Sequence, residues 1–324
     1  MDRNLALEFV RVTEAAAISC AEWFGKGDKI AADQAAVDSM RERFNYVDFK
    51  GEVVIGEGDK DEAPLLYIGE KIGTGNGPEM DIAVDPLEGT SLTAKGKPNA
   101  ISVLASGPKG TLLKAPGTYM DQIAVGPRAK GVIDITKSVK DNVKAVANAL
   151  NKDIKETTVV VMDRDRHKKL INDLRKVGCR IAFIEHGSVT AGLAPGFTDS
   201  GIDMMISICG SPEGVITAAG LKCLGGDFQG ILKPHNKEFE KQAVDMGFTD
   251  LDKVFTIDEL AKGDRVSFAA TGVSDGPFLR GVHYTSYGAV TESLVMRAKS
   301  GTVRFIETYH HLGKERKGFA RRRM

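Results

Sequence analysis

The sequence lacks long apolar runs, closely paired cysteines and an excess of charge of either sign. No stretch approaches the length that a membrane-spanning helix needs, and the N-terminal segment is acidic and helix-forming, without the apolar core of a secretory signal. The 44 lysines and arginines balance the 44 aspartates and glutamates, so no net field attracts nucleic acid or a membrane surface. We therefore expect a cytoplasmic protein that binds neither of them.

Metal and disulfide motifs built on cysteine or histidine are also missing. The four cysteines, Cys20, Cys179, Cys209 and Cys223, lie far apart, and the six histidines form no HExxH or zinc-finger spacing. Buried free thiols in a reducing compartment are the ordinary interpretation. A chain of 324 residues, 42% hydrophobic and 27% charged, is long enough for two packed lobes or one large domain.

The most informative stretch is Asp81–Ser91, in which a short apolar strand leads into carboxylates and then into a Gly-Thr-Ser turn. Asp85 and Glu88 are close enough to repel each other, and a hard cation such as Mg²⁺ or Mn²⁺ relieves that repulsion. The hydroxyl and amide groups beside them suit a phosphate. The alternative is a plain acidic corner, since Asp-Pro is common in turns; the whole string favours metal plus phosphate.

A second acidic loop follows the strand at residues 53–55. Glycines flank Glu57, and the acids from there to Glu62 are denser than an ordinary turn needs, although a solvated loop would also carry them. Asp33 lies in the first turn of a helix that we expect to end near residue 44, where the helix dipole alone favours an acid. Acids collected from separate strand ends commonly bind two or more cations for phosphate chemistry. Asp33, Glu57, Asp85 and Glu88 are therefore candidate ligands.

Beyond about residue 135 strands and helices alternate, with strands at 157–162, 180–184 and 204–208. This alternation predicts a mainly parallel sheet wrapped by helices, whose ligands bind at the carboxyl ends of the strands. Three polar segments fall at those ends: Arg164-Asp165-Arg166, His186-Gly187-Ser188 and Gly210-Ser211-Pro212-Glu213-Gly214.

These segments suit a second anionic group on the substrate. Guanidinium groups bind phosphate through paired hydrogen bonds, although a solvated helix start explains the two arginines equally well. Gly210–Gly214 presents amides at a helix N-terminus, which is a natural anion site. Glu213 in that turn is either an acid stabilised by the helix dipole or a metal ligand.

Several of these motifs resemble one known family. Gly56-Glu57-Gly58, Asp61-Glu62-Ala63-Pro64 and Asp85-Pro86-Leu87-Glu88-Gly89-Thr90 resemble the metal-dependent, lithium-sensitive sugar phosphatases, and within them the class II fructose-1,6-bisphosphatases of bacterial type. The resemblance covers nearly the whole chain. It implies an α/β fold, with an α+β N-terminal lobe and an α/β lobe in a layered α/β/α/β/α sandwich.

For the domains, we expect residues 1–140 to form a metal- and phosphate-binding α+β domain. Residues 141–270 would form an α/β substrate-binding domain, with the C-terminal strands at about 271–324 as candidates to rejoin the first.

The resemblance implies hydrolysis of the 1-phosphate of fructose 1,6-bisphosphate, a gluconeogenic step, by a homo-oligomer (dimer or tetramer) that uses two or more Mn²⁺ or Mg²⁺ ions. The implied metal ligands are Asp33, Glu57, Asp85, Glu88 and Glu213. The implied substrate contacts are Glu88, Gly89, Thr90, Tyr119, Arg164, Asp165, Arg166, His186, Gly187, Ser188 and Gly210. Thr90, with Asp61 as its acidic partner, matches the pair that activates the attacking water.

Two segments depart from the family pattern. His186-Gly187-Ser188 stands where the family commonly has Asp-Gly-Asp, and Arg164-Asp165-Arg166 stands in place of Lys-Pro-Arg. The first change bears on the sugar and leaves room for a broader substrate range, such as sedoheptulose 1,7-bisphosphate. An inositol-type phosphatase or a non-catalytic sugar-phosphate-binding protein are the less favoured alternatives.

Overall fold

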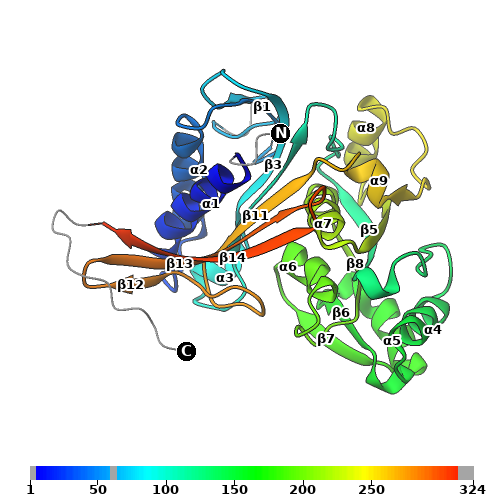
Figure 1. The fold of residues 1–324 in the computed structure, drawn as a ribbon. Coiled ribbons are helices and arrows are strands. Elements are labelled where there is room, and N and C mark those ends of the chain that lie inside the picture. Colours follow the sequence, from blue (N-terminus) through cyan, green and yellow to red (C-terminus); the bar gives the residue numbers. More distant parts are fainter. Residues whose placement is uncertain (1–4, 59–63, 313–324) are drawn as a thin grey trace.

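The protein, described here by a computed structural model, contains two β-sheets, and the structure describes residues 5–58 and 64–312 (Figure 1). The first sheet has the order β12-β13-β11-β4-β3-β1-β2, and β14 pairs with β13. Its strands are β1 (Lys50–Ile55), β2 (Lys71–Ile72), β3 (Glu79–Glu88), β4 (Ile101–Pro108), β11 (Ser267–Gly272), β12 (His283–Thr285), β13 (Gly288–Arg297) and β14 (Thr302–His311).

Two helices cover the outer face of this sheet (Figure 1). They are α1 (Leu5–Ala21) and α2 (Lys29–Phe44). The side chain of Asp28, the N-cap of α2, accepts a hydrogen bond from the amide of Ala31. Phe9, Phe44 and Phe49 meet edge-on or tilted with ring centroids 5.3–6.4 Å apart. Each such buried ring stabilises the fold by about 1.5–3 kcal/mol.

The second sheet has the order β10-β9-β5-β8-β6-β7. Its strands are β5 (Tyr119–Val125), β6 (Thr158–Met162), β7 (Arg180–Ile184), β8 (Met204–Gly210), β9 (Asp227–Leu232) and β10 (Phe255–Thr256). The prediction of a mainly parallel sheet is wrong here. β6, β7, β8 and β9 do run in one direction, but β5 is inserted antiparallel between β8 and β9, and β10 is antiparallel to β9. The sheet is mixed because β5 comes from an earlier part of the chain, and the connection from β8 to β9 passes over it.

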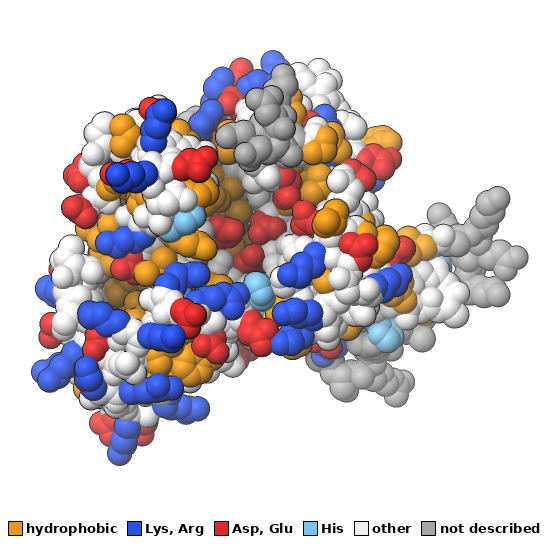
Figure 2. Space-filling view, turned by 180° about the vertical axis from the view of Figure 1, so that it is seen from behind, with side chains coloured by type: hydrophobic (Ala, Val, Ile, Leu, Met, Phe, Trp, Pro, Cys, Tyr) orange, Lys and Arg blue, Asp and Glu red, His pale blue; other side chains and the backbone are white. Residues whose placement is uncertain are grey.

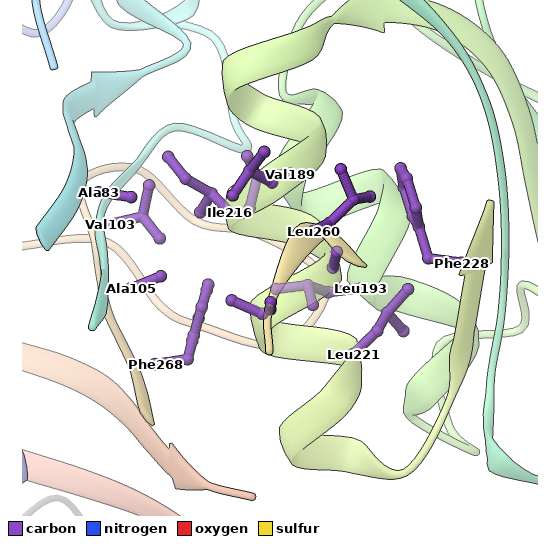
Figure 3. Packing of buried hydrophobic residues seen from close by; sticks show 14 of the residues in the cluster. Ala83, Val103, Ala105, Val189, Leu193, Ile216, Leu221, Phe228, Leu260 and Phe268 are labelled. Atoms are coloured by element: carbon purple, nitrogen blue, oxygen red, sulfur yellow. The ribbon is translucent and has the colours of Figure 1, made fainter. Parts of the chain in front are cut away.

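Three helices lie between the two sheets: α6 (Ser188–Leu193), α7 (Ser211–Leu224) and α9 (Ile257–Leu260). Figure 3 shows the packing there, with Val103 and Phe268 of the first sheet opposite Ile216 and Leu221 of α7. On the outer face of the second sheet lie α4 (Val139–Leu150) and α5 (Lys168–Val177). The five layers are therefore helix, sheet, helix, sheet, helix, and the predicted layered α/β sandwich is confirmed.

The remaining elements are short or peripheral. They are α3 (Thr90–Ala94), α8 (Lys237–Asp245) and the 3₁₀ turns η1 (Pro127–Ala129), η2 (Ile154–Glu156), η3 (Asp165–His167) and η4 (Ala194–Gly196). Helices α4 and α8 and strands β9 and β13 were not predicted, because charged or small residues interrupt their apolar patterns. Within the described residues, no helix is long and apolar enough to cross a membrane.

Sheet membership does not follow the expected boundary at residue 140. β5 precedes it and yet belongs to the second sheet, while β11, β13 and β14 pair within the first sheet. The division into two domains stays a prediction.

Candidate active site

A cavity of about 470 Å³ lies where the two sheets meet at the first turn of α7. Figure 2 shows a hollow in this face of the molecule, with acidic side chains inside it and basic side chains along one side. From the first sheet and its helices the cavity is lined by Asp33, Glu57, Asp85, Glu88, Gly89 and Thr90. From the second it is lined by Tyr119, Arg164, Arg166, His186, Gly187, Ser188, Gly210 and Glu213. Residues far apart in sequence thus converge on one space.

Two predicted residues fall elsewhere. Asp61 lies outside the described residues. Asp165 is not part of the cavity wall: its side chain is 94% exposed and forms an ion pair with Lys168 at 2.9 Å.

The acidic end is built from irregular strand ends. The pairing of β3 with β4 slips between Asp85 and Glu88, and this places both carboxylates at the cavity. The amide of Leu87 donates to Oδ1 of Asp85 at 3.1 Å. Beside them, Gly56 directly follows β1, and a Cβ added there would come within 1.9 Å of the Leu66 carbonyl oxygen. Only glycine permits this close approach, which sets the position of Glu57.

The carboxyl groups at this end raise one another's pKa values. Burial, and then the charge of Asp33, raise the pKa of Glu57 to about 8. Burial and the charge of Glu88 raise the pKa of Glu213 to about 7. Burial, followed by the charges of Glu88 and Glu57, raises the pKa of Asp85 well above its usual value. Such mutual repulsion is the electrostatic situation that a divalent cation relieves.

The donor set fits a hard cation. All five predicted ligands are carboxylates, which Mg²⁺ and Mn²⁺ prefer over softer ligands. Oε2 of Glu213 is buried and has no hydrogen-bond partner in the described part of the chain, so this oxygen is available to coordinate a cation. Within the described ranges, however, no three acidic, cysteine or histidine side chains already stand close enough to hold one ion. The assignment of individual ligands stays a prediction.

Glu88 also joins the two halves of the cavity. Its Oε1 accepts hydrogen bonds from the Ser188 hydroxyl at 3.1 Å and from the Val189 amide at 2.9 Å, at the start of α6. Ser188 was expected to contact substrate. In this structure its hydroxyl donates to Glu88, and its contact with substrate stays a prediction.

Thr90 is the first residue of α3. Gly89 before it has φ of 96°, a left-handed conformation that favours glycine. The hydroxyl oxygen of Thr90 lies 3.0 Å from the Leu87 carbonyl oxygen and 3.3 Å from Oδ1 of Asp33. A small rotation about its side-chain bond can therefore redirect its single proton between acceptors.

The basic end is at the carboxyl end of β6. Arg166 lies over the ring of Tyr119, 4.5 Å from its centroid, and donates through Nε and Nη2 to the Ile208 carbonyl oxygen at 3.0 and 2.7 Å. Arg164 donates to the Glu185 carbonyl, and its Nη2 lies 3.3 Å from Nε2 of His186. Burial and then the charge of Arg164 lower the pKa of His186. This end favours anions.

Some residues at the cavity were not predicted. Ser91, Cys209 and Pro212 also line it, and His167 supports its wall from behind. Ser91 and Pro212 lie within motifs that the sequence analysis singled out, although neither was assigned a role. His167 follows Arg166 directly, but nothing in the local pattern distinguishes a histidine that supports the site from one on the surface.

Comparison with known proteins agrees with this geometry. The family model described as "Bacterial fructose-1,6-bisphosphatase, glpX-encoded" matches residues 3–310. A protein of Synechococcus sp. (strain JA-2-3B'a(2-13)), named D-fructose 1,6-bisphosphatase class 2/sedoheptulose 1,7-bisphosphatase, is 45% identical over 334 residues, covering 96% of each chain. A protein of the same name from Thermosynechococcus vestitus (strain NIES-2133 / IAM M-273 / BP-1) is 45% identical over 338 residues, again covering 96% of each. The chain therefore belongs to the bacterial, glpX-encoded fructose-1,6-bisphosphatase family.

Proposed function

We propose that the protein hydrolyses the 1-phosphate of fructose 1,6-bisphosphate, giving fructose 6-phosphate and inorganic phosphate in gluconeogenesis. The observation that carries this is the polarity of the cavity: carboxylates and Thr90 stand at one end, and Arg164 and Arg166 at the other. A substrate with an anionic group at each end matches that arrangement. Family membership supports the same reaction.

The acidic end would hold two or more Mg²⁺ or Mn²⁺ ions through Asp33, Glu57, Asp85, Glu88 and Glu213. When bound, such ions neutralise phosphate charge and lower the pKa of water from 15.7 toward roughly 7. The protein's part is to hold the carboxylates in place. The hydrogen bonds from Ser188 and Val189 do this for Glu88, and the Leu87 amide does it for Asp85.

Thr90 would orient the attacking water. Its hydroxyl can accept the water's proton while passing its own to a carboxylate, for which Asp61 is the expected acceptor. The water oxygen then forms the new bond to phosphorus, the bond from phosphorus to the sugar oxygen breaks, and the sugar oxygen that leaves takes up a proton from solvent. Positioning of this kind supplies much of the catalysis in phosphoryl transfer.

The arginine end would hold the 6-phosphate. Arg166 is already held by Ile208 and Tyr119, so little conformational entropy is lost when a phosphate binds there. Binding energy from this remote group would then position the reacting end. An inositol-type monophosphatase would have no use for such a second anion site.

A second candidate substrate is sedoheptulose 1,7-bisphosphate, which appears in the names of the relatives. The observation in its favour is at His186 and Ser188. The Ser188 hydroxyl donates to Glu88, and His186 lies beside Arg164. The segment 186–188 therefore presents no carboxylate of its own that could select particular sugar hydroxyls. A cavity wall without such carboxylates is compatible with a seven-carbon sugar as well as with fructose.

Location and assembly follow the same reasoning. All four cysteines are free thiols, and Cys20, Cys209 and Cys223 are buried, which supports a reducing cytoplasm.

A homo-oligomer, dimer or tetramer, is supported by β14, which carries the exposed apolar side chains Val303 and Phe305. Light scattering of the purified protein would give the subunit count.

Phosphate release tests the reaction. Purified protein is assayed with fructose 1,6-bisphosphate, sedoheptulose 1,7-bisphosphate, fructose 6-phosphate and inositol 1-phosphate, each with Mn²⁺, with Mg²⁺ and with EDTA. We expect metal-dependent release from the bisphosphates alone. Release from inositol 1-phosphate alone would move the function to another substrate, and tight binding of the bisphosphates without release would indicate a sugar-phosphate-binding protein.

A further inference from the structure

The second sheet opens at the carboxyl ends of β6 and β8, beside the cavity. In the described structure the two strands pair through Val159–Met204 and Val160–Met205. Farther along, the amide of Met162 donates to the Ser207 hydroxyl at 3.2 Å. Beyond Val160 and Met205, a side chain of β8 therefore takes the place of the backbone pairing between β6 and β8.

Ile208 of β8 is held from this open side on both of its backbone groups. Its amide donates to Nε2 of His167 at 2.8 Å, and its carbonyl accepts from Nε and Nη2 of Arg166. Ile208 stands opposite Asp121 of β5, and its backbone groups point away from that strand, as alternate residues of an antiparallel pair do. Two consecutive residues of η3, Arg166 and His167, therefore both hydrogen-bond to the backbone of Ile208 in β8.

The chemistry of His167 suits this role. The ring is fully buried, and burial, followed by the charge of Arg166, lowers its pKa to about 4. The imidazole is therefore neutral at pH 7, and since Nε2 accepts the Ile208 amide, the ring proton is on Nδ1.

Arg166 is correspondingly restrained. Its Nε and Nη2 bond to Ile208, its Nη2 also lies 3.8 Å from the Met162 sulfur, and its plane rests on Tyr119. A guanidinium has five N–H donors. In the described contacts the Nη1 group is left to meet an anion in the cavity, and its position depends on where the Ile208 carbonyl lies.

We propose that His167 is a positioning residue for substrate binding: it fixes the Ile208 peptide, which in turn fixes the guanidinium of Arg166. The inference rests on the proposed function only in taking the 6-phosphate as the anion that Arg166 binds. The expected consequence is confined to that phosphate. Loss of the acceptor at His167 weakens binding of ligands that carry a 6-phosphate and leaves the acidic end unchanged.

A matched pair of amide variants tests this. In His167→Gln the side-chain oxygen can reach the place of Nε2, whereas in His167→Asn it is too short. We expect His167→Asn to raise KM for fructose 1,6-bisphosphate about tenfold, the equivalent of one charge-assisted hydrogen bond, with kcat within threefold of the wild type. His167→Gln should recover most of the affinity. KM for fructose 1-phosphate, which lacks the remote group, should not change.

Two further measurements separate positioning from general damage. If His167 acts through Arg166, then adding His167→Asn to Arg166→Ala produces no further rise in KM. His310→Asn is the control for loss of a histidine hydrogen bond elsewhere, since Nε2 of His310 lies 2.9 Å from the Thr291 hydroxyl in the other sheet. It should leave KM as it is.

Binding of fructose 6-phosphate, measured by calorimetry, requires no turnover and therefore tests His167 even if the wild type releases no phosphate. We expect about tenfold weaker binding by His167→Asn. The proposal would be overturned if His167→Asn bound fructose 6-phosphate as tightly as the wild type does. It would also be overturned if the variant weakened fructose 1-phosphate and fructose 6-phosphate equally, or if its effect added to that of Arg166→Ala. Absence of metal-dependent release by the wild type would instead overturn the proposed function.

Discussion

Ser188 at the start of α6 donates a hydrogen bond to Glu88 at the end of β3, with 3.1 Å between the hydroxyl and carboxylate oxygens. This contact connects the two sheets across the cavity. It also fixes one oxygen of a predicted metal ligand, so the second sheet takes part in shaping the acidic end. A residue expected to touch the sugar thus orients a carboxylate.

Ser188→Ala should weaken metal binding. The substitution removes one of the two donors to Oε1 of Glu88, while the Val189 amide remains. A hydrogen bond to a charged group is worth about 1.5–3 kcal/mol, so we expect Mn²⁺ affinity to fall roughly tenfold, measured by calorimetry. Thr190→Ala is the matched control, because the Thr190 hydroxyl is buried in the same helix without a partner among the described residues. Equal effects of the two variants would refute the role given to Ser188.

Thr90→Ala should nearly abolish turnover. Removal of a group that relays a proton typically costs about 10²–10⁴-fold in kcat, whereas the carboxylates that hold the metal stay in place. Phosphate release under saturating Mn²⁺ measures kcat, and calorimetry with fructose 1,6-bisphosphate measures binding. Thr90→Ser keeps the hydroxyl and should restore most of the rate. Full activity in Thr90→Ala would show that another group activates the water.

Arg166→Ala should act on affinity. It deletes the guanidinium over Tyr119, and the loss of the charge-assisted contact from Nη1 to phosphate raises KM for the bisphosphate by roughly tenfold to a hundredfold. Arg166→Lys retains the charge but loses the planar guanidinium that bonds to the Ile208 carbonyl, so it should recover only part of the loss. An unchanged KM in Arg166→Ala would exclude the 6-phosphate role.

Gly210→Ala should disturb Glu213. A Cβ at Gly210 would lie 1.9 Å from Oε2 of Glu213, so this carboxylate would have to move. We expect Mn²⁺ binding to weaken about tenfold, with a smaller change in the free energy of unfolding, because Glu213 can rotate away. Gly117→Ala serves as the control, since a Cβ there meets nothing within 4 Å. Wild-type metal affinity in Gly210→Ala would argue against Glu213 as a ligand.

Without divalent cations the protein should become less stable as the pH rises from about 5 to 8. The folded pKa values of Glu57 and Glu213, about 8 and about 7, exceed the ordinary value of 4.5. Between these limits the two carboxyl groups bind more protons in the folded state than in the unfolded state, so their contribution to the free energy of unfolding falls with pH, by at most roughly 1.4 kcal/mol for each unit of pKa difference.

Urea unfolding in EDTA at several pH values measures this slope. Added Mn²⁺ should stabilise the protein more at pH 8 than at pH 6, because at the lower pH it must displace protons from the carboxyl groups. Glu213→Gln should reduce the slope. A slope in Glu213→Gln equal to that of the wild type would contradict the raised pKa of Glu213.

The sequence by itself determined the class of chemistry and most of the elements. Glu57, Asp85 and Glu88 follow apolar strands directly, and strand patterns and turn residues are local properties of the chain. The same locality explains why the end of α2 and the strands β6, β7 and β8 were predicted close to their observed bounds. Family motifs added the expected roles, and those roles stay predictions for the individual residues.

Only the tertiary structure decided how these pieces meet. Insertion of β5 between β8 and β9 depends on pairing between distant segments, which no local pattern encodes. Whether Ser188 turns to Glu88, whether Asp165 faces solvent, and whether His167 holds Ile208 depend on which partner is within about 3 Å. A hydrogen bond is directional and of short range, so residue type can suggest a donor or acceptor, but only the packed fold determines its partner.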